Sequence, residues 1–331
     1  MSAETGRKLS DLPSGDPALL NRISWARRWN DRKASIDYAL AARRKALDGE
    51  GRRSRAEQGF SLRTLGWHAL WRGDLKLAMD YCLRAETYLP ESEFALARAA
   101  IYSLIAKIHY NRNRFDLAKC SVDRGQWLVQ EVTHDPATVA DLMLTQAAIQ
   151  RQSGERARAG ITLGRAREVS SGENAALVDI CTASLLLDDG DAVQARDHAA
   201  AALSYCEETD CQVITPFARS ILAGCYSARG MHLDAYDQIS TGLNELNDDD
   251  HLARCSLLRR QAAHHLYKGE QEEALGVLNQ AARIAEDQTY GLLHKQIALT
   301  LADKLEEIGD FRGAVKQHKI AWKLQSEMRV L

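Results

Sequence analysis

Residues 65–90 read LGWHALWRGDLKLAMDYCLRAETYLP, and Gly73-Asp74 in the middle of this stretch predicts a turn between two helices. Glycine supplies the left-handed conformation that ends a first helix, and an acidic residue caps or begins a second one. Gly73 lies five residues before an alanine, and this spacing recurs along the chain, with Asn113 replacing the glycine in one copy. The alanines are Ala78, Ala118, Ala159, Ala195, Ala235, Ala274 and Ala314. Because successive alanines are 36 to 41 residues apart, the sequence is a repeat array.

Each copy has two further small residues in the same register, one lying twelve residues before the alanine and one seven residues after it. The first set is Gly66, Ala106, Ala147, Ala183, Ala223, Ala262 and Ala302. The second set is Ala85, Gly125, Ala166, Ala202, Gly242, Ala281 and Ala321. Small residues at fixed points on two successive helices let their backbones approach closely. The register therefore predicts an all-α solenoid of tightly crossed helix pairs, with about sixteen helices in total.

The stretch around Gly73 resembles a tetratricopeptide repeat. That family places a small residue midway along the first helix, a glycine in the turn, alanines on the second helix and a proline at the end, as in Gly66, Gly73, Ala78, Ala85 and Pro90. The resemblance covers about residues 60–324, although the spacing here exceeds the family's usual period of about 34 residues. It implies a right-handed superhelical solenoid of antiparallel helix pairs, whose first helices line a concave surface.

We expect three segments along the chain. Residues 1–15 are polar, contain Ser, Gly and Pro, and are predicted to be disordered. Residues 16–55 are interpreted as a degenerate leading helix pair that caps the array, since Asp16-Pro17 is typical of a helix start. Residues 56–331 hold the seven tetratricopeptide-like repeats of about 40 residues. The chain contains only five prolines and lacks the alternating apolar and polar run that is typical of a strand. Both features agree with this assignment.

The sequence favours a binding protein over an enzyme. A phosphate-binding loop, an HExxH zinc motif, a CxxC pair and a GxSxG elbow are all missing. We therefore predict no catalytic residue, no metal and no cofactor. The best histidine pair, His264-His265, is a poor chelate, because adjacent side chains on a helix point about 100° apart.

A cytoplasmic location is expected from two features. No apolar run approaches the ~20 residues that span a bilayer, and the N-terminus lacks the apolar core of a secretion signal. The seven cysteines are odd in number and irregularly spaced, which argues against a disulfide framework and for a reducing compartment. We predict no contact with a membrane.

Charge is distributed unevenly along the chain. Residues 1–72 contain 15 basic and 8 acidic residues, whereas the whole chain has a net charge of -2. The excess of basic residues in this segment has three interpretations: a solvated helix face, an acidic protein partner, or the acidic end of a neighbouring subunit in a homodimer. Nucleic acid is the least favoured partner, because the total charge is not basic and no recognition-helix motif is present.

The resemblance also indicates which residues face the concave surface. Counting from the small residue of each first helix, the positions three before, one after and four after it face outward. In the first three repeats these positions carry basic and aromatic side chains, a composition that anchors peptide ligands. We predict a binding strip for an acidic or aromatic peptide segment made of Arg63, Trp67, Lys107, Tyr110 and Arg151.

The last helix carries a second resemblance. Gly309-Asp310-Phe311, Ala314, His318-Lys319, Leu324 and Glu327 resemble the region that joins tetratricopeptide sensor arrays to diguanylate cyclase domains in bacterial signalling proteins. This implies that the chain is the sensory or regulatory part of a bacterial signalling system, with a protein or peptide as its ligand. The alternative is a static adaptor that holds a multiprotein assembly together.

Overall fold

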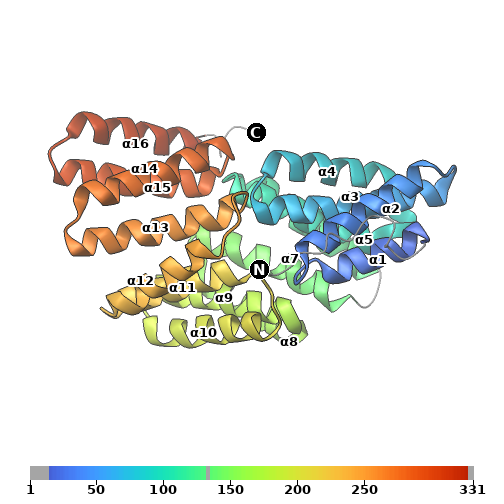
Figure 1. Cartoon of the computed structure of the whole chain (residues 1–331), viewed down its shortest axis with the longest axis horizontal. Helices are drawn as coiled ribbons and strands as arrows, with labels where there is room; N and C mark the ends of the chain where they lie inside the picture. The colour runs from blue at the N-terminus through green and yellow to red at the C-terminus, as the bar shows by residue number, and fades with distance from the viewer. Residues whose placement is uncertain (1–14, 132–134, 327–331) are drawn as a thin grey trace, which may run out of the picture.

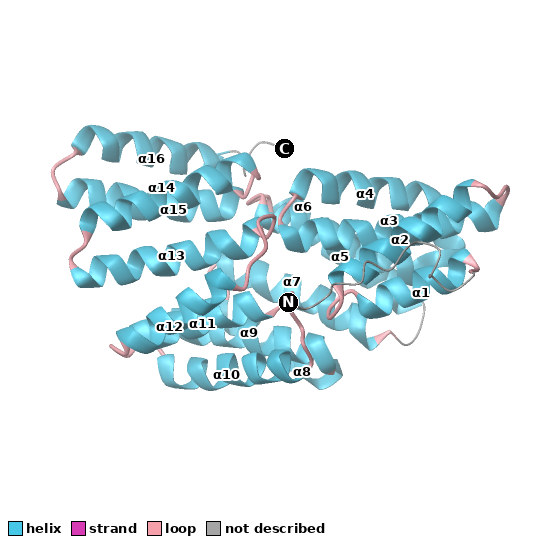
Figure 2. Cartoon of the chain, in the orientation of Figure 1, coloured by secondary structure: helices cyan, strands magenta, loops and turns pink. Residues whose placement is uncertain are grey.

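The computed structural model describes residues 15–131 and 135–326, so nearly all of the predicted N-terminal tail lies outside the described residues. Within them the chain forms sixteen α-helices and no strand, which confirms the predicted all-α solenoid (Figure 2). The first eight helices are Pro17–Arg27 (α1), Arg32–Leu47 (α2), Arg52–Arg72 (α3), Leu75–Tyr88 (α4), Glu91–Asn111 (α5), Phe115–Glu131 (α6), Pro136–Gln152 (α7) and Arg156–Val169 (α8). The others are Gly172–Asp188 (α9), Ala192–Glu208 (α10), Thr215–Ala228 (α11), His232–Asn244 (α12), His251–Lys268 (α13), Gln271–Asp287 (α14), Gly291–Glu307 (α15) and Phe311–Ser326 (α16).

The turns form as the sequence predicts. Gly73 has φ +100° and Asn113 has φ +62°, so the asparagine adopts the same left-handed conformation as the glycines of the other copies. Asp74 and Asp191 each accept a hydrogen bond from a backbone N–H in the first turn of the following helix, at 2.9 and 3.0 Å. A left-handed glycine or asparagine thus follows these first helices, and Asp74 and Asp191 fix the starts of the second helices α4 and α10.

The three columns of small residues lie where paired helices cross. All of their alanines are buried, with at most 5% of their surface exposed. At Gly66, an added Cβ would lie 3.2 Å from the Cys82 Sγ and 3.5 Å from the Ala78 carbonyl oxygen, so α3 and α4 are already in contact there. A larger side chain at such a crossing must push the two backbones apart.

Leucine at a buried column position therefore destabilises the fold. We expect Ala183→Leu and Ala262→Leu each to lower the free energy of unfolding by about 1–3 kcal/mol, because overpacking forces backbone shifts. Ala201→Leu on α10 is the control, since Ala201 is exposed. Urea unfolding measures the difference, and equal stabilities of the three variants would contradict the register.

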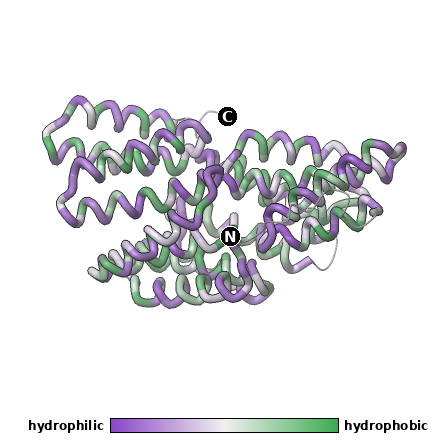
Figure 3. The backbone as a smooth tube through the Cα atoms, viewed as in Figure 1, coloured by the Kyte–Doolittle hydropathy of each residue, from purple (hydrophilic) through white to green (hydrophobic). Residues whose placement is uncertain are grey.

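Polar residues interrupt every helix, as the hydropathy colouring shows (Figure 3). No helix within residues 15–131 and 135–326 has the length and apolar character needed to cross a bilayer.

The solenoid winds until its first repeats lie against its last ones, a closure that the sequence did not predict. Helix α3 contacts α13, and α5 contacts α15. In Figure 1 the ends of α3–α6 lie beside the group α13–α16. Tyr290 is fully buried at this junction, and an added Cβ on Gly73 would overlap its hydroxyl.

Oppositely charged segments also meet at the closure. Arg32 on α2 binds Asp250 at 2.6 Å, and Arg72 on α3 binds Asp249 at 2.9 Å. Farther along the junction, the Asn113 amide donates to the Leu324 carbonyl oxygen at 3.0 Å. Part of the basic excess of residues 1–72 is thus paired with acidic residues of the same chain.

Two glycine variants separate closure from local turn geometry. Gly73→Ala and Gly154→Ala both force alanine into a left-handed turn, which costs about 1–2 kcal/mol. Only Gly73 lies against Tyr290, whereas an added Cβ on Gly154 would meet nothing within 4 Å. We expect Gly73→Ala to be the less stable variant and to have the larger radius of gyration in small-angle X-ray scattering. Identical scattering and stability would show that this contact does not hold the ring closed.

Candidate functional site

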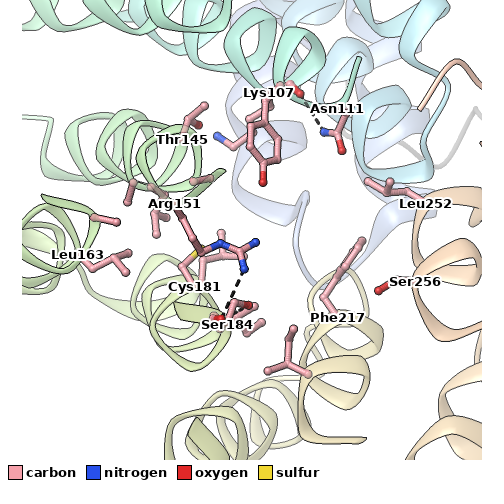
Figure 4. A pocket seen from close by; sticks show the side chains of 18 of the residues that line it. Lys107, Asn111, Thr145, Arg151, Leu163, Cys181, Ser184, Phe217, Leu252 and Ser256 are labelled. Atoms are coloured by element: carbon pink, nitrogen blue, oxygen red, sulfur yellow. Dashed lines mark hydrogen bonds between the residues drawn. The ribbon is translucent and has the colours of Figure 1, made fainter. Parts of the chain in front are cut away.

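A cavity of about 300 Å³ opens on the concave side of the ring. Most of its lining comes from the first helices of successive pairs, namely α3, α5, α7, α9, α11 and α13, with α8 closing one side (Figure 4). Each of these helices buries one face against its pair partner and turns the opposite face inward. The cavity is therefore a product of the repeat architecture, and residues far apart in sequence converge on it.

One wall of the cavity is apolar and aromatic. Trp71 from α3 and Phe217 from α11 meet edge to face, with ring centroids 5.7 Å apart. Leu144 on α7 and Ile180 on α9 line the neighbouring wall. The Trp71–Phe217 contact joins the second helix pair to the sixth across the ring. This arrangement offers an apolar side chain a surface that contains two aromatic rings.

Two cations line the cavity, and each has an acidic partner behind it. Lys107 Nζ lies 2.5 Å from an Asp141 oxygen, and Arg151 lies 2.8 Å from an Asp188 oxygen. Arg151 reaches from α7 toward the carbonyl oxygen of Ser184 on α9 (Figure 4). Burial opposes the charge on Arg151, but Tyr110 and Asp188 outweigh it and raise the pKa of Arg151. Both side chains are thus fixed as oriented donors at an apolar site.

The structure brings three of the five predicted strip residues together at the cavity. Lys107, Tyr110 and Arg151 line it, and burial raises the pKa of the Tyr110 hydroxyl, which stays protonated. Arg63 and Trp67 do not line it. Trp67 is only 4% exposed and packs edge to face on Trp29, with centroids 4.6 Å apart. A binding role for all five residues stays a prediction, and the continuous strip does not form.

Arg63 and Arg28 instead form a cation–aromatic cluster with Trp25. The Arg63 guanidinium carbon lies 3.8 Å from the Trp25 ring centroid, and that of Arg28 lies 4.1 Å from it. Burial, followed by the charge of Arg28, lowers the pKa of Arg63 to about 9. The sequence predicted a leading helix pair in residues 16–55, but not that Trp25 of α1 would cover Arg63 or that Trp29, in the turn after α1, would cover Trp67.

Among the lining residues that sequence reasoning missed are Trp71, Phe217 and the α13 residues Leu252 and Ser256. Trp71 lies one helical turn beyond Trp67, five residues after the small residue of its repeat. Phe217 lies six residues before the corresponding Ala223. The cavity therefore runs obliquely, from the C-terminal ends of the early helices to the N-terminal ends of the later ones. A fixed register can identify the inner helices but not this drift.

Comparison with known proteins identifies the fold but no family. No family model matches the chain. No curated protein matches its sequence. Among solved structures, a Rap protein complexed with Competence and Sporulation Factor superposes with a TM-score of 0.68 at 13% identity, covering 96% of this chain and 99% of that chain.

Two further structures extend this likeness. The Rap conjugation gene regulator of plasmid pLS20, in complex with the Phr* peptide, has a TM-score of 0.67 at 13% identity and coverages of 95% and 95%. NprR in complex with its cognate peptide NprX has a TM-score of 0.64 at 11% identity, covering 92% of this chain and 89% of that chain. At such identities the likeness shows the fold, and the chain is a tetratricopeptide-like α-solenoid.

His68, next to the predicted site residue Trp67, is a buried titratable group that holds α2 and α3 together. Its Nε2 lies 2.7 Å from the Ser35 Oγ. Burial, followed by the charges of Arg32 and Arg72, lowers the pKa of His68 to about 3. The imidazole is therefore neutral in the folded protein at neutral pH.

This buried histidine makes the fold sensitive to acid. The folded pKa of His68 lies below the unfolded value of about 6.5, so the unfolded chain binds the proton first as pH falls. Stability present above pH ~6.5 is lost toward the folded pKa, with a slope of up to about 1.4 kcal/mol per pH unit. We expect His68→Gln to reduce this slope in urea unfolding measured between pH 7.5 and 5. An unchanged slope would show that another group carries the acid sensitivity.

Proposed function

We propose that this chain is a non-enzymatic regulatory module that binds a short peptide or an extended protein segment in its concave cavity. The observation that carries the proposal is the cavity itself, where an aromatic wall and the fixed donors Lys107 and Arg151 converge inside a closed ring. A mainly apolar pocket with a few placed polar groups is the usual form of a ligand site.

Peptide is the ligand class that the comparisons support. Two of the similar structures, the pLS20 regulator and NprR, contain bound peptides and match most of this chain in fold. The cavity volume of about 300 Å³ lies at the lower end of the range for small-ligand sites, about 300–1,000 Å³. It therefore accommodates one or two apolar side chains of a peptide whose remainder follows the concave surface.

Regulation would arise from the position of the cavity at the ring closure. Trp71 and Phe217 belong to opposite sides of the ring and both line the cavity. A ligand that separates or joins these two side chains binds the open and closed rings with different affinities. Such a difference is what a ligand needs to shift a conformational equilibrium. Repeats that contact mainly their neighbours then transmit the change along the array.

The output of this regulation is a further part of the proposal. The resemblance of residues 309–327 to the sensor regions of diguanylate cyclase proteins supports a bacterial signalling role, with control of a cyclase as its most specific form. A static adaptor is the alternative, and it predicts partner binding without any change in the ring.

Affinity capture tests the proposal directly. The purified chain is incubated with a peptide-rich cell extract, and the retained molecules are identified by mass spectrometry. Small-angle scattering with and without the captured fraction then reports on the ring. Retained peptides that change the scattering support a regulator, whereas a retained protein that leaves the scattering unchanged supports the adaptor.

The two tryptophans distinguish ligand binding from core packing. We expect Trp71→Ala to weaken retention of the captured peptides at least tenfold, because it removes an aromatic anchor of the cavity. Trp67→Ala should instead destabilise the fold by about 3–5 kcal/mol, because Trp67 is a buried core residue. Peptide titration and thermal melts of both proteins measure the two effects. Loss of stability alone in Trp71→Ala would rule out its anchoring role.

A further inference from the structure

Arg260 on α13 lies flat against the backbone of α11 beside the cavity. An added Cβ on Gly224 would lie 2.7 Å from the Arg260 Cζ and 2.8 Å from each of its two Nη atoms. The near equality of these distances shows that the guanidinium plane faces Gly224. Arg260 is one helical turn after Ser256, a residue that lines the cavity and meets Ser220 of α11 at 2.8 Å. Arg260 itself does not line the cavity, and we call its position, one turn beyond Ser256, the rim of the cavity.

Within the described residues, Arg260 forms no salt bridge and no side-chain hydrogen bond. The cavity cations Lys107 and Arg151 are each paired with an aspartate, and Arg259 donates to Gln296 at 2.8 Å. Burial, followed by the charge of Arg259, lowers the pKa of Arg260 to about 10. The side chain is partly buried, so it keeps less of its hydration than an exposed arginine and has no acidic partner to replace it.

Arg260 occupies a repeat position that lines the cavity in the three preceding repeats. It lies two residues before the small residue of its repeat, Ala262. The equivalent residues of the three preceding repeats are Thr145, Cys181 and Ile221, and all three line the cavity. On α13 the cavity has shifted toward the N-terminal end of the helix, so Arg260 lies one turn beyond the lining residue Ser256, and there the repeat position changes from a neutral side chain to a cation.

We infer that Arg260 binds a carboxylate of the peptide ligand at the rim of the cavity, while an apolar side chain of the same peptide occupies the cavity. This inference rests on the proposed function. A guanidinium presents a planar fork of donors that matches a carboxylate. The charges of Arg151 and Asp188 both act on Arg260, but only Arg151 forms a salt bridge with Asp188. The carboxylate comes either from an acidic side chain or from the peptide C-terminus.

Gly224 has a specific role in this site. Glycine is unfavourable in a helix interior, and alanine at position 224 would favour α11. An alanine Cβ would, however, displace the Arg260 guanidinium from its present position. The glycine therefore gives the guanidinium room against α11.

Synthetic pentapeptide pools provide the test. Four pools are compared: peptides with or without Asp and Glu, each with a free or an amidated C-terminus. Equilibrium dialysis against the full chain, followed by mass spectrometry, measures how much of each peptide pool the protein retains. We expect at least tenfold stronger retention of pools that carry a carboxylate, and the pool that is retained identifies its source. Arg260→Gln should remove this preference. The control Arg283→Gln, which removes a charge from α14 on the outside of the ring, should keep it.

Stability measurements separate binding from a structural role. Arg260→Gln should melt at or above the wild-type temperature, because it removes a cation without an acidic partner from a partly buried position. Gly224→Ala should also keep its melting temperature while weakening the carboxylate preference. A fall in the melting temperature of Arg260→Gln by several degrees, or a carboxylate preference that survives in it, would overturn the inference. Wild-type retention without a carboxylate preference overturns the inference alone, whereas no retention of any pool overturns peptide binding as well.

Discussion

The close crossing of paired helices at small buried residues is the constraint on which the rest of the structure depends. Ala78, Ala183 and Ala262 have no room for a larger side chain, so each pair has nearly the same crossing geometry. Equal pairs stacked in sequence turn by nearly equal steps, and small rotations accumulate into a superhelix. The ring and its concave surface thus follow from one packing rule that is applied seven times.

Closure of the ring adds contacts between the first and last repeats, which the packing of neighbouring helix pairs does not predict. Gly73 accommodates Tyr290, and Arg32 and Arg72 bind the acidic pair Asp249 and Asp250. These residues occupy positions that have no equivalent partner in neighbouring repeats, because only the ends of the array meet each other. The concave groove becomes a bounded cavity at this junction. A ligand in the cavity and the closure of the ring therefore involve the same helices, α3, α11 and α13.

The sequence predicts local features of this fold well and long-range ones less well. The turns, the small-residue columns and the inner position of the first helices are properties of a single repeat, and a repeated pattern reveals them. Lys107, Tyr110 and Arg151 lie at the cavity because they occupy the middle of its oblique path. Trp67 is buried instead, because Trp29 in the turn after α1 packs on it, and the path of that turn depends on packing that no short motif encodes. Trp71 and Phe217 become neighbours only when the ring closes.

The distribution of charge likewise has a local part, which the sequence shows, and a long-range part, which only the folded chain shows. Residues 1–72 carry an excess of basic residues, which is compatible with a solvated helix face, an acidic protein partner or a neighbouring subunit. In the folded chain, Arg32 and Arg72 meet acidic residues that lie far away in the sequence, and Arg63 packs on Trp25. A count of charges along the chain therefore says little about the charge that is free to bind a ligand. The cations that stay available are those without an acidic partner in the fold, and next to the cavity the partly buried Arg260 is such a residue among those the structure describes.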